Sequence, residues 1–136
     1  MPRRRIAIID DDPDILSMLE ALLLQAGYGV LCYTTGTDAY EWIRGEQPDL
    51  VILDLWIELP DSGYTVIGLL ASDPATRTIP VIVFSAYLHR FQMEAVLPVE
   101  QDIVLLEKAE PITQLLALVT RLLARTDQRR ADRGDH

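Results

Sequence analysis

The chain has 136 residues, of which 49% are hydrophobic and 24% charged, and its formal net charge is −9. A chain of this length buries roughly two-thirds of its unfolded surface, so it can fold as one domain without disulfide or metal staples. The single cysteine, Cys32, excludes an internal disulfide framework, and the negative charge argues against binding nucleic acid through its phosphates. No stretch approaches the roughly 18 apolar residues of a membrane span, and no signal core follows the N-terminal arginines, so we expect a soluble cytoplasmic protein.

Five short apolar runs predict β-strands. Each run is rich in Val, Ile or Leu, and most are apolar on consecutive rather than alternating positions. Consecutive burial is typical of a parallel sheet that helices cover on both faces. We therefore expect the side chains of these strands, including the thiol of Cys32, to lie in the core. The runs are Ile6–Ile9, Val30–Tyr33, Leu50–Leu53, Val81–Phe84 and Ile103–Leu106.

Helix signals separate the strands. Asp12 is a suitable N-cap and Pro13 a suitable first residue for a helix that ends near Ala26, with Gly27 as the capping residue at its C-terminus. Strict alternation of strands and helices predicts an α/β fold with a parallel sheet and right-handed crossovers. The other helices are expected from Thr37 to about Arg44 with Gly45 ending it, from Tyr64 to about Ser72, within Arg90–Leu97, and from near Pro111 to about Arg125.

Chemically distinctive side chains follow four of the predicted strands. In an open α/β sheet, ligands bind beyond the carboxyl ends of the strands. Clustered carboxylates repel one another, and oxygen ligands suit a hard cation such as Mg²⁺. The pattern predicts a magnesium site beside a hydroxyl and an ammonium that suit a phosphate, where one carboxylate could act as a nucleophile. The residues are Asp10, Asp11 and Asp12 after the first strand, Asp54 after the third, Ser85 after the fourth, and Glu107 with Lys108, the only lysine, after the fifth.

This constellation resembles the receiver domain of bacterial two-component response regulators. The resemblance covers residues 4 to about 125 and rests on four segments: IAIIDDDPDIL at 6–16, PDLVILDLW at 48–56, IPVIVFSA at 79–86 and LLEKAEP at 105–111. It implies a CheY-like, flavodoxin-like doubly wound sheet of five parallel strands in the order 2-1-3-4-5, flanked by five helices. It also implies a receiver domain at 1–126, followed at 127–136 by a polar tail or the start of a linker.

The resemblance implies a phosphoryl-transfer role for the acidic residues. Asp54 would be the phosphoacceptor, attacking a phosphohistidine and becoming an aspartyl phosphate. Asp10, Asp11 and Asp54 would hold Mg²⁺ (or Mn²⁺), with the backbone carbonyl of Trp56 as a further ligand. The loop after Asp54 is one residue longer than the usual pattern, and Trp56 is bulky enough to slow attack by water on the aspartyl phosphate.

The resemblance implies a switch at the neighbouring strand ends. Ser85 would bond a phosphoryl oxygen, and Lys108 would pair with the phosphate as a point charge. A new phosphoryl group would draw both side chains inward and bias the surface formed by the helix expected within Arg90–Leu97 (helix 4), the strand Ile103–Leu106 (strand 5) and the helix expected from near Pro111 (helix 5). Leu105 stands at the switch position three residues before the lysine, where the family commonly has Tyr or Phe.

The resemblance also implies partners. The phosphoryl donor would be a sensor histidine kinase or a histidine phosphotransfer protein, and the downstream protein target is not named by the sequence. Ile15 and Met18 are candidates for the face of this chain on which the donor docks, and burial in the core is an equal alternative for them. Direct contact with nucleic acid or a membrane is not expected. A homodimer is a further expectation, through the surface of the helix within Arg90–Leu97 (helix 4), the strand Ile103–Leu106 (strand 5) and the last helix (helix 5).

Two other functions remain open at this point. A pseudo-receiver would use the fold only to bind partners; the missing aromatic at Leu105, and the Ala instead of Pro after Lys108, favour it. The complete set of acids, hydroxyl and lysine argues against it. A phosphatase of the haloacid-dehalogenase type would use Asp10 as nucleophile and Asp12 as acid and base, but it leaves Asp54 unexplained.

Overall fold

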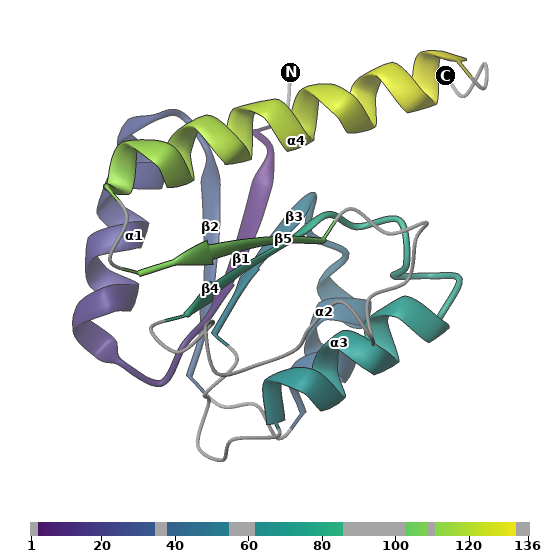
Figure 1. Ribbon diagram of the computed structural model, residues 1–136, viewed down its shortest axis with the longest axis horizontal. Coiled ribbons are helices and arrows are strands. Elements are labelled where there is room, and N and C mark those ends of the chain that lie inside the picture. The colour runs from purple at the N-terminus through teal and green to yellow at the C-terminus, as the bar shows by residue number, and fades with distance from the viewer. Residues whose placement is uncertain (1–2, 35–37, 55–61, 86–102, 109–110, 133–136) are drawn as a thin grey trace.

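A parallel sheet of five strands forms the centre of the computed structural model, which describes residues 3–34, 38–54, 62–85, 103–108 and 111–132 (Figure 1). The strand order is β2-β1-β3-β4-β5, and every neighbouring pair is parallel, as predicted. The strands are β1 (Arg5–Ile9), β2 (Gly29–Tyr33), β3 (Leu50–Leu53), β4 (Val81–Ser85) and β5 (Ile103–Glu107).

Helices cover both faces of the sheet. In the described parts of the chain these are α1 (Pro13–Gln25), α2 (Ala39–Glu46), α3 (Ser62–Ser72) and α4 (Ile112–Asp132). The first and last, α1 and α4, pack on one face, whereas α2 and α3 pack on the other (Figure 1). The helix predicted within 90–97 lies outside the described residues. No helix that the structure describes is long and apolar enough to span a membrane.

The sheet separates two apolar cores, which explains why its strands are apolar on consecutive positions. Successive side chains of a strand point to opposite faces, so a strand covered on both faces needs an unbroken apolar run. In β1 and β3, one set of side chains packs under α1 and α4 and the alternating set under α2 and α3. The first set is Ile6, Ile8, Leu50 and Ile52, and the second is Ala7, Ile9, Val51 and Leu53.

The first helix begins and ends as predicted. Asp12 has extended backbone angles (φ −92°, ψ 109°), and its side chain accepts a hydrogen bond from the amide of Asp14. Pro13 opens the helix, and Gly27 follows its C-terminus with a φ of 99°, in the left-handed region that favours glycine. Local sequence therefore fixes both ends of α1.

Two helices end later than predicted. Gly45 does not end α2, which continues to Glu46 and stops at Gln47 with a φ of 48°. The Gln47 amide nitrogen Nε2 donates to the carbonyls of Arg44 and Ala75, and these bonds hold the left-handed residue in place. The last helix, α4, continues past Arg125 to Asp132.

The prediction that Cys32 lies in the core is wrong. Its strand, β2, is an edge strand, and the Cys32 side chain is exposed. The thiol Sγ donates to Oε2 of Glu20 on α1 at 3.6 Å. Partial desolvation of the sulfur beneath its neighbours and the nearby Glu20 carboxylate together raise the pKa of the Cys32 thiol to about 11, even though the side chain reaches solvent.

Candidate functional site

Two central strands bring the predicted acids to one edge of the sheet. Ile9 at the end of β1 is in register with Leu53 at the end of β3, so the residues that follow them are neighbours. The amide of Asp10 donates to the carbonyl of Tyr33 at 3.2 Å, and the amide of Asp54 donates to the carbonyl of Ile9 at 3.0 Å. The sheet's hydrogen bonding thus continues through both aspartates and fixes where their side chains start.

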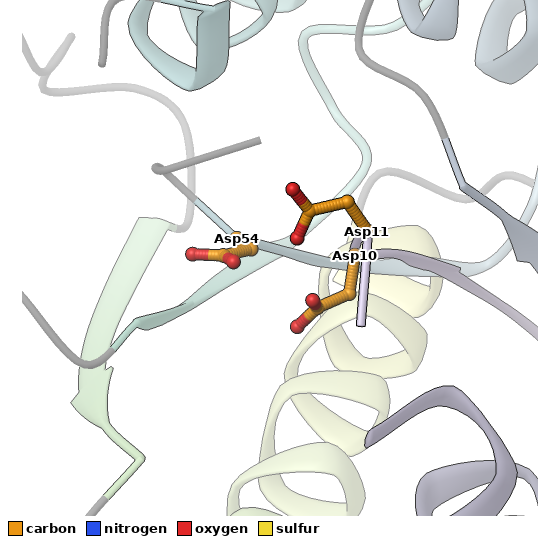
Figure 2. Close-up of side chains that lie close together, drawn as sticks. All are labelled: Asp10, Asp11 and Asp54. Carbon is orange, nitrogen blue, oxygen red and sulfur yellow. The ribbon is translucent and has the colours of Figure 1, made fainter. Parts of the chain in front are cut away.

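Three carboxylates converge at this edge (Figure 2). One oxygen from each of Asp10, Asp11 and Asp54, here called the acid cluster, lies within 4.8 Å of the others. Asp10 and Asp54 are 2% and 6% exposed, whereas Asp11 is open to solvent. Oxygen donors of this kind, with one side open for water or phosphate oxygens, fit a Mg²⁺ ion.

Among the residues that the structure describes, Lys108 brings an ammonium to the acid cluster. Its Nζ lies 2.7 Å from Oδ2 of Asp10 and 3.3 Å from Oδ2 of Asp54, and its side chain is 19% exposed. Three carboxylates and one ammonium give a formal charge of −3 + 1 = −2, which a divalent cation would neutralise. The donor set therefore fits the metal in charge as well as in chemistry.

Burial and the neighbouring charges have opposite effects on the pKa values of Asp10 and Lys108. Burial raises the pKa of Asp10 above its ordinary value, although hydrogen bonds from Lys108 and from the backbone of Asp12 oppose the shift. Burial by itself lowers the pKa of Lys108, but the hydrogen bond to Asp10 and the charges of Asp54 and Asp10 outweigh it, so the pKa is raised. Lys108 therefore stays protonated beside the acids.

Of the remaining predicted site residues, the structure describes Ser85 and Leu105 but not Trp56. Ser85 ends β4 in register with Glu107 of β5, so its backbone lies at the same edge of the sheet. Leu105 on β5 is 37% exposed. Trp56, the predicted backbone ligand, lies outside the described residues.

The two candidate docking residues on α1 have different surroundings. Ile15 is half-buried and packs against the core beneath α1 and α4. Met18 is 41% exposed. The core alternative therefore describes Ile15, and the docking role stays a prediction that suits Met18 better.

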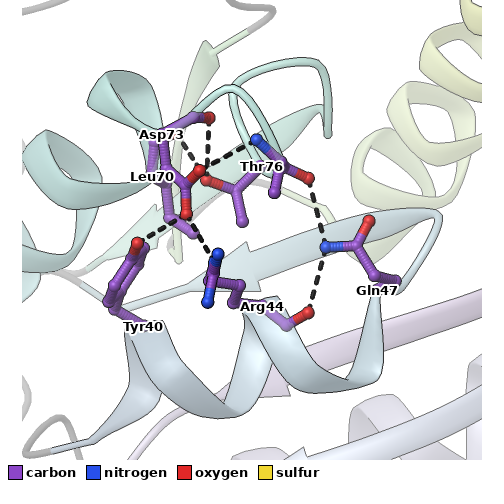
Figure 3. A network of polar contacts seen from close by, with 7 residues as sticks. Tyr40, Arg44, Gln47, Leu70, Asp73 and Thr76 are labelled. Carbon is purple, nitrogen blue, oxygen red and sulfur yellow. Dashed lines mark hydrogen bonds and ion pairs between the residues drawn. The ribbon is translucent and has the colours of Figure 1, made fainter.

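A second polar network, which the sequence analysis missed, ties α2 to the segment after α3 (Figure 3). Oδ2 of Asp73 accepts a hydrogen bond from the Tyr40 hydroxyl at 2.5 Å. The same oxygen forms an ion pair with Nε of Arg44 at 2.9 Å. Buried Thr76 donates through its hydroxyl to the carbonyl of Leu70 at 2.7 Å. The segment after α3 leads into the amino end of β4, whereas the acid cluster lies at the carboxyl ends of β1 and β3. The network therefore lies at the opposite edge of the sheet from the acid cluster, and it connects α2 to the end of α3.

Comparisons with known proteins agree with this geometry. The family model described as "Response regulator receiver domain" matches residues 6–120. Protein Rrf1 of Nitratidesulfovibrio vulgaris is 33% identical over 121 residues, which cover 88% of this chain and 83% of Rrf1. The DNA-binding dual master transcriptional regulator RpaA of Synechocystis sp. is 36% identical over 130 residues, which cover 91% of this chain. The chain spans about half of that relative, 51% of its length.

A solved structure shows the same fold. The receiver domain of the sensor histidine kinase PA1611 from Pseudomonas aeruginosa PAO1, which has a magnesium ion coordinated in its active-site cleft, superposes with a TM-score of 0.77. The two sequences are 21% identical, and the match covers 90% of this chain and 99% of that one. With its family match, its sheet order and its acid cluster, this chain belongs to the response regulator receiver domain family.

Proposed function

We propose that this receiver domain is a phosphorylation-controlled switch in which Asp54 accepts a phosphoryl group from a phosphohistidine in a Mg²⁺-dependent reaction. The observation that carries the proposal is the environment of Asp54. Its buried carboxylate lies beside the carboxylates of Asp10 and Asp11 and 3.3 Å from the ammonium of Lys108. Such a site gathers a nucleophile, ligands for a metal and a fixed cation at one point.

The transfer needs little covalent chemistry from the protein. A carboxylate oxygen of Asp54 attacks phosphorus, the bond between phosphorus and the histidine nitrogen breaks, and that electron pair stays on the imidazole. Asp10, Asp11 and Asp54 would hold Mg²⁺, which supplies charge stabilisation to the phosphoryl oxygens when bound. The magnesium in the cleft of the PA1611 receiver supports this assignment.

The positive charge of Lys108 is already in place beside Asp54 before any phosphoryl group arrives. Its ammonium is already held between Asp10 and Asp54, within reach of any group attached to Asp54. A phosphoryl group on Asp54 carries more negative charge than the carboxylate that it replaces, so it draws the ammonium away from Asp10. Ser85, which ends the neighbouring strand β4, would bond another phosphoryl oxygen.

A movement of Lys108 would be passed on to the surface elements next to it in the chain. Lys108 directly follows Glu107, the last residue of β5, and α4 begins at Ile112. A shift of its ammonium therefore acts on β5, where Leu105 is exposed at the switch position, and on the start of α4. In the described part of the chain, the output surface consists of β5 and α4, and it binds the downstream protein or a second copy of the chain; the helix predicted within 90–97 lies outside the described residues.

The phosphoryl donor is a sensor histidine kinase or a histidine phosphotransfer protein. It docks beside the exposed Asp11, on the outer face of α1, where Met18 offers an apolar contact. The apolar surface of Met18 suits a helix of the donor that presents its own apolar stripe.

Intact mass spectrometry tests the proposal. The chain is incubated with Mg²⁺ and acetyl phosphate as wild type, Asp54→Ala and Asp10→Ala. One phosphoryl adduct in the wild type that disappears in Asp54→Ala supports the proposal. An adduct that survives in Asp54→Ala and is lost in Asp10→Ala would instead indicate phosphatase chemistry at Asp10. No adduct, even with a cognate kinase, would indicate a pseudo-receiver.

A further inference from the structure

Asp10 is held at both of its carboxylate oxygens. Oδ2 lies 2.7 Å from the ammonium of Lys108. Oδ1 accepts a hydrogen bond of 3.0 Å from the backbone amide of Asp12. These two contacts pull on opposite oxygens, so the direction of the Asp10 carboxylate depends on the backbone of Asp12 as much as on Lys108.

The backbone of Asp12 is in turn fixed by its own side chain. Oδ1 of Asp12 accepts from the amide of Asp14 at 2.9 Å, and the carbonyl of Asp12 accepts from the amide of Leu16 at 3.1 Å. With φ at −92° and ψ at 109°, the residue joins the extended backbone of the acid cluster to the first turn of α1. The cap therefore sets the orientation of the peptide whose N–H reaches Asp10.

The Asp12 carboxylate is engaged at the start of α1. Its Oδ1 is used by the helix start, and the three residues whose oxygens lie within 4.8 Å of one another are Asp10, Asp11 and Asp54. A role for Asp12 at the metal site thus runs through geometry and not through direct ligation.

We propose that Asp12 is a positioning residue for the magnesium site, which orients the Asp10 carboxylate by capping α1 and thereby holding its own amide against Oδ1. This inference rests on the proposed function, because it concerns the metal that the transfer needs. Without the cap, the amide of Asp12 leaves Oδ1, and Asp10 turns toward Lys108, which then competes with the metal for its oxygens. Groups that orient metal ligands typically change metal affinity by about 10–100-fold.

Three substitutions separate the cap from the charge of Asp12. Asp12→Asn keeps a capping side chain and loses the charge, whereas Asp12→Glu keeps the charge on a side chain that is a poor N-cap. Asp12→Ala loses both. Ala21→Gly is the matched control, because Ala21 is an exposed position of the same helix and glycine there weakens α1 about as much as loss of a cap.

Metal affinity is measured on the full chain from the loss of the free Mn²⁺ signal in electron paramagnetic resonance, followed by displacement with Mg²⁺. Circular dichroism checks that each variant is folded. We expect wild-type affinity in Asp12→Asn and Ala21→Gly, and affinity about tenfold weaker in Asp12→Ala and Asp12→Glu.

Four other outcomes overturn the inference. Weak binding by Asp12→Asn with full binding by Asp12→Glu would show that the charge acts, not the cap. Equal weakening in Ala21→Gly and Asp12→Ala would reduce the effect to helix stability. Wild-type affinity in both Asp12→Ala and Asp12→Glu would show that the cap does not matter. Absence of metal binding by the wild type would overturn the proposed function itself, and this inference with it.

Discussion

Removing the ammonium of Lys108 should destabilise the metal-free protein and make its stability depend strongly on Mg²⁺. The Lys108→Met substitution keeps most of the apolar stem and deletes the charge that lies 2.7 Å from Asp10 and 3.3 Å from Asp54. Both carboxylates are then left almost fully buried beside Asp11 and without this ammonium.

The size of the effect follows from the burial of the pair. Removing one partner of a buried ion pair typically costs about 3–5 kcal/mol. The Lys108 side chain is 19% exposed and Asp11 is open to solvent, so water recovers part of this loss. We therefore expect a decrease in the free energy of unfolding of about 2–4 kcal/mol at neutral pH without metal.

Urea unfolding with and without Mg²⁺ measures the effect. A ligand that binds only the folded state stabilises it in proportion to the logarithm of its concentration over its Kd. Since the variant cluster carries −3 instead of −2, Mg²⁺ should stabilise Lys108→Met more than wild type. The control is Arg44→Met, which breaks a more exposed ion pair with Asp73 at the other edge of the sheet and should respond to Mg²⁺ as wild type does. If Lys108→Met loses no more stability than Arg44→Met, or if Mg²⁺ stabilises both equally, the account of the acid cluster is wrong.

Two further predictions concern other parts of the molecule. Because the pKa of the Cys32 thiol is raised to about 11, iodoacetamide should modify this exposed thiol slowly at pH 8, and Glu20→Gln should speed the reaction; alkylation as fast as that of free cysteine would refute this. The hydrogen bond from Tyr40 lowers the pKa of Asp73. The ionised Asp73 therefore stabilises the folded state at pH values above the ordinary pKa of an aspartate, and this stabilisation is lost as the pH falls through the lowered pKa. Tyr40→Phe should therefore reduce stability most near neutral pH, with a difference from wild type that shrinks in acid; a loss that stays constant with pH in urea unfolding would count against this.

The strands and the first helix could be predicted because their signals are local. An unbroken apolar run such as Leu50–Leu53 has few alternatives to a strand buried on both faces. Asp12, Pro13 and Gly27 satisfy the backbone requirements of helix ends within their own neighbourhood. The parallel arrangement then brought the acids together, since the carboxyl ends of parallel strands meet at one edge.

Features set by contacts between distant segments could not be predicted. The end of α2 at Gln47 depends on a hydrogen bond to Ala75, which is far along the chain. The apolar composition of β2 predicted burial of Cys32, whereas the edge position of the strand, which the expected strand order already implied, leaves this side chain exposed. The sequence predicted that Lys108 lies beside the acids, but its ion pair with Oδ2 of Asp10 and the amide of Asp12 on Oδ1 are visible only in three dimensions.

The central claim is that Asp54 carries the phosphoryl group, and locating that group in the chain tests it most directly. After phosphorylation with Mg²⁺ present, borohydride reduces an aspartyl phosphate to homoserine, which peptide mass spectrometry places in the sequence. The account predicts homoserine at position 54, and no homoserine when the reaction contains EDTA. Homoserine at position 10, or its absence after transfer from a phosphorylated histidine kinase, would contradict the account.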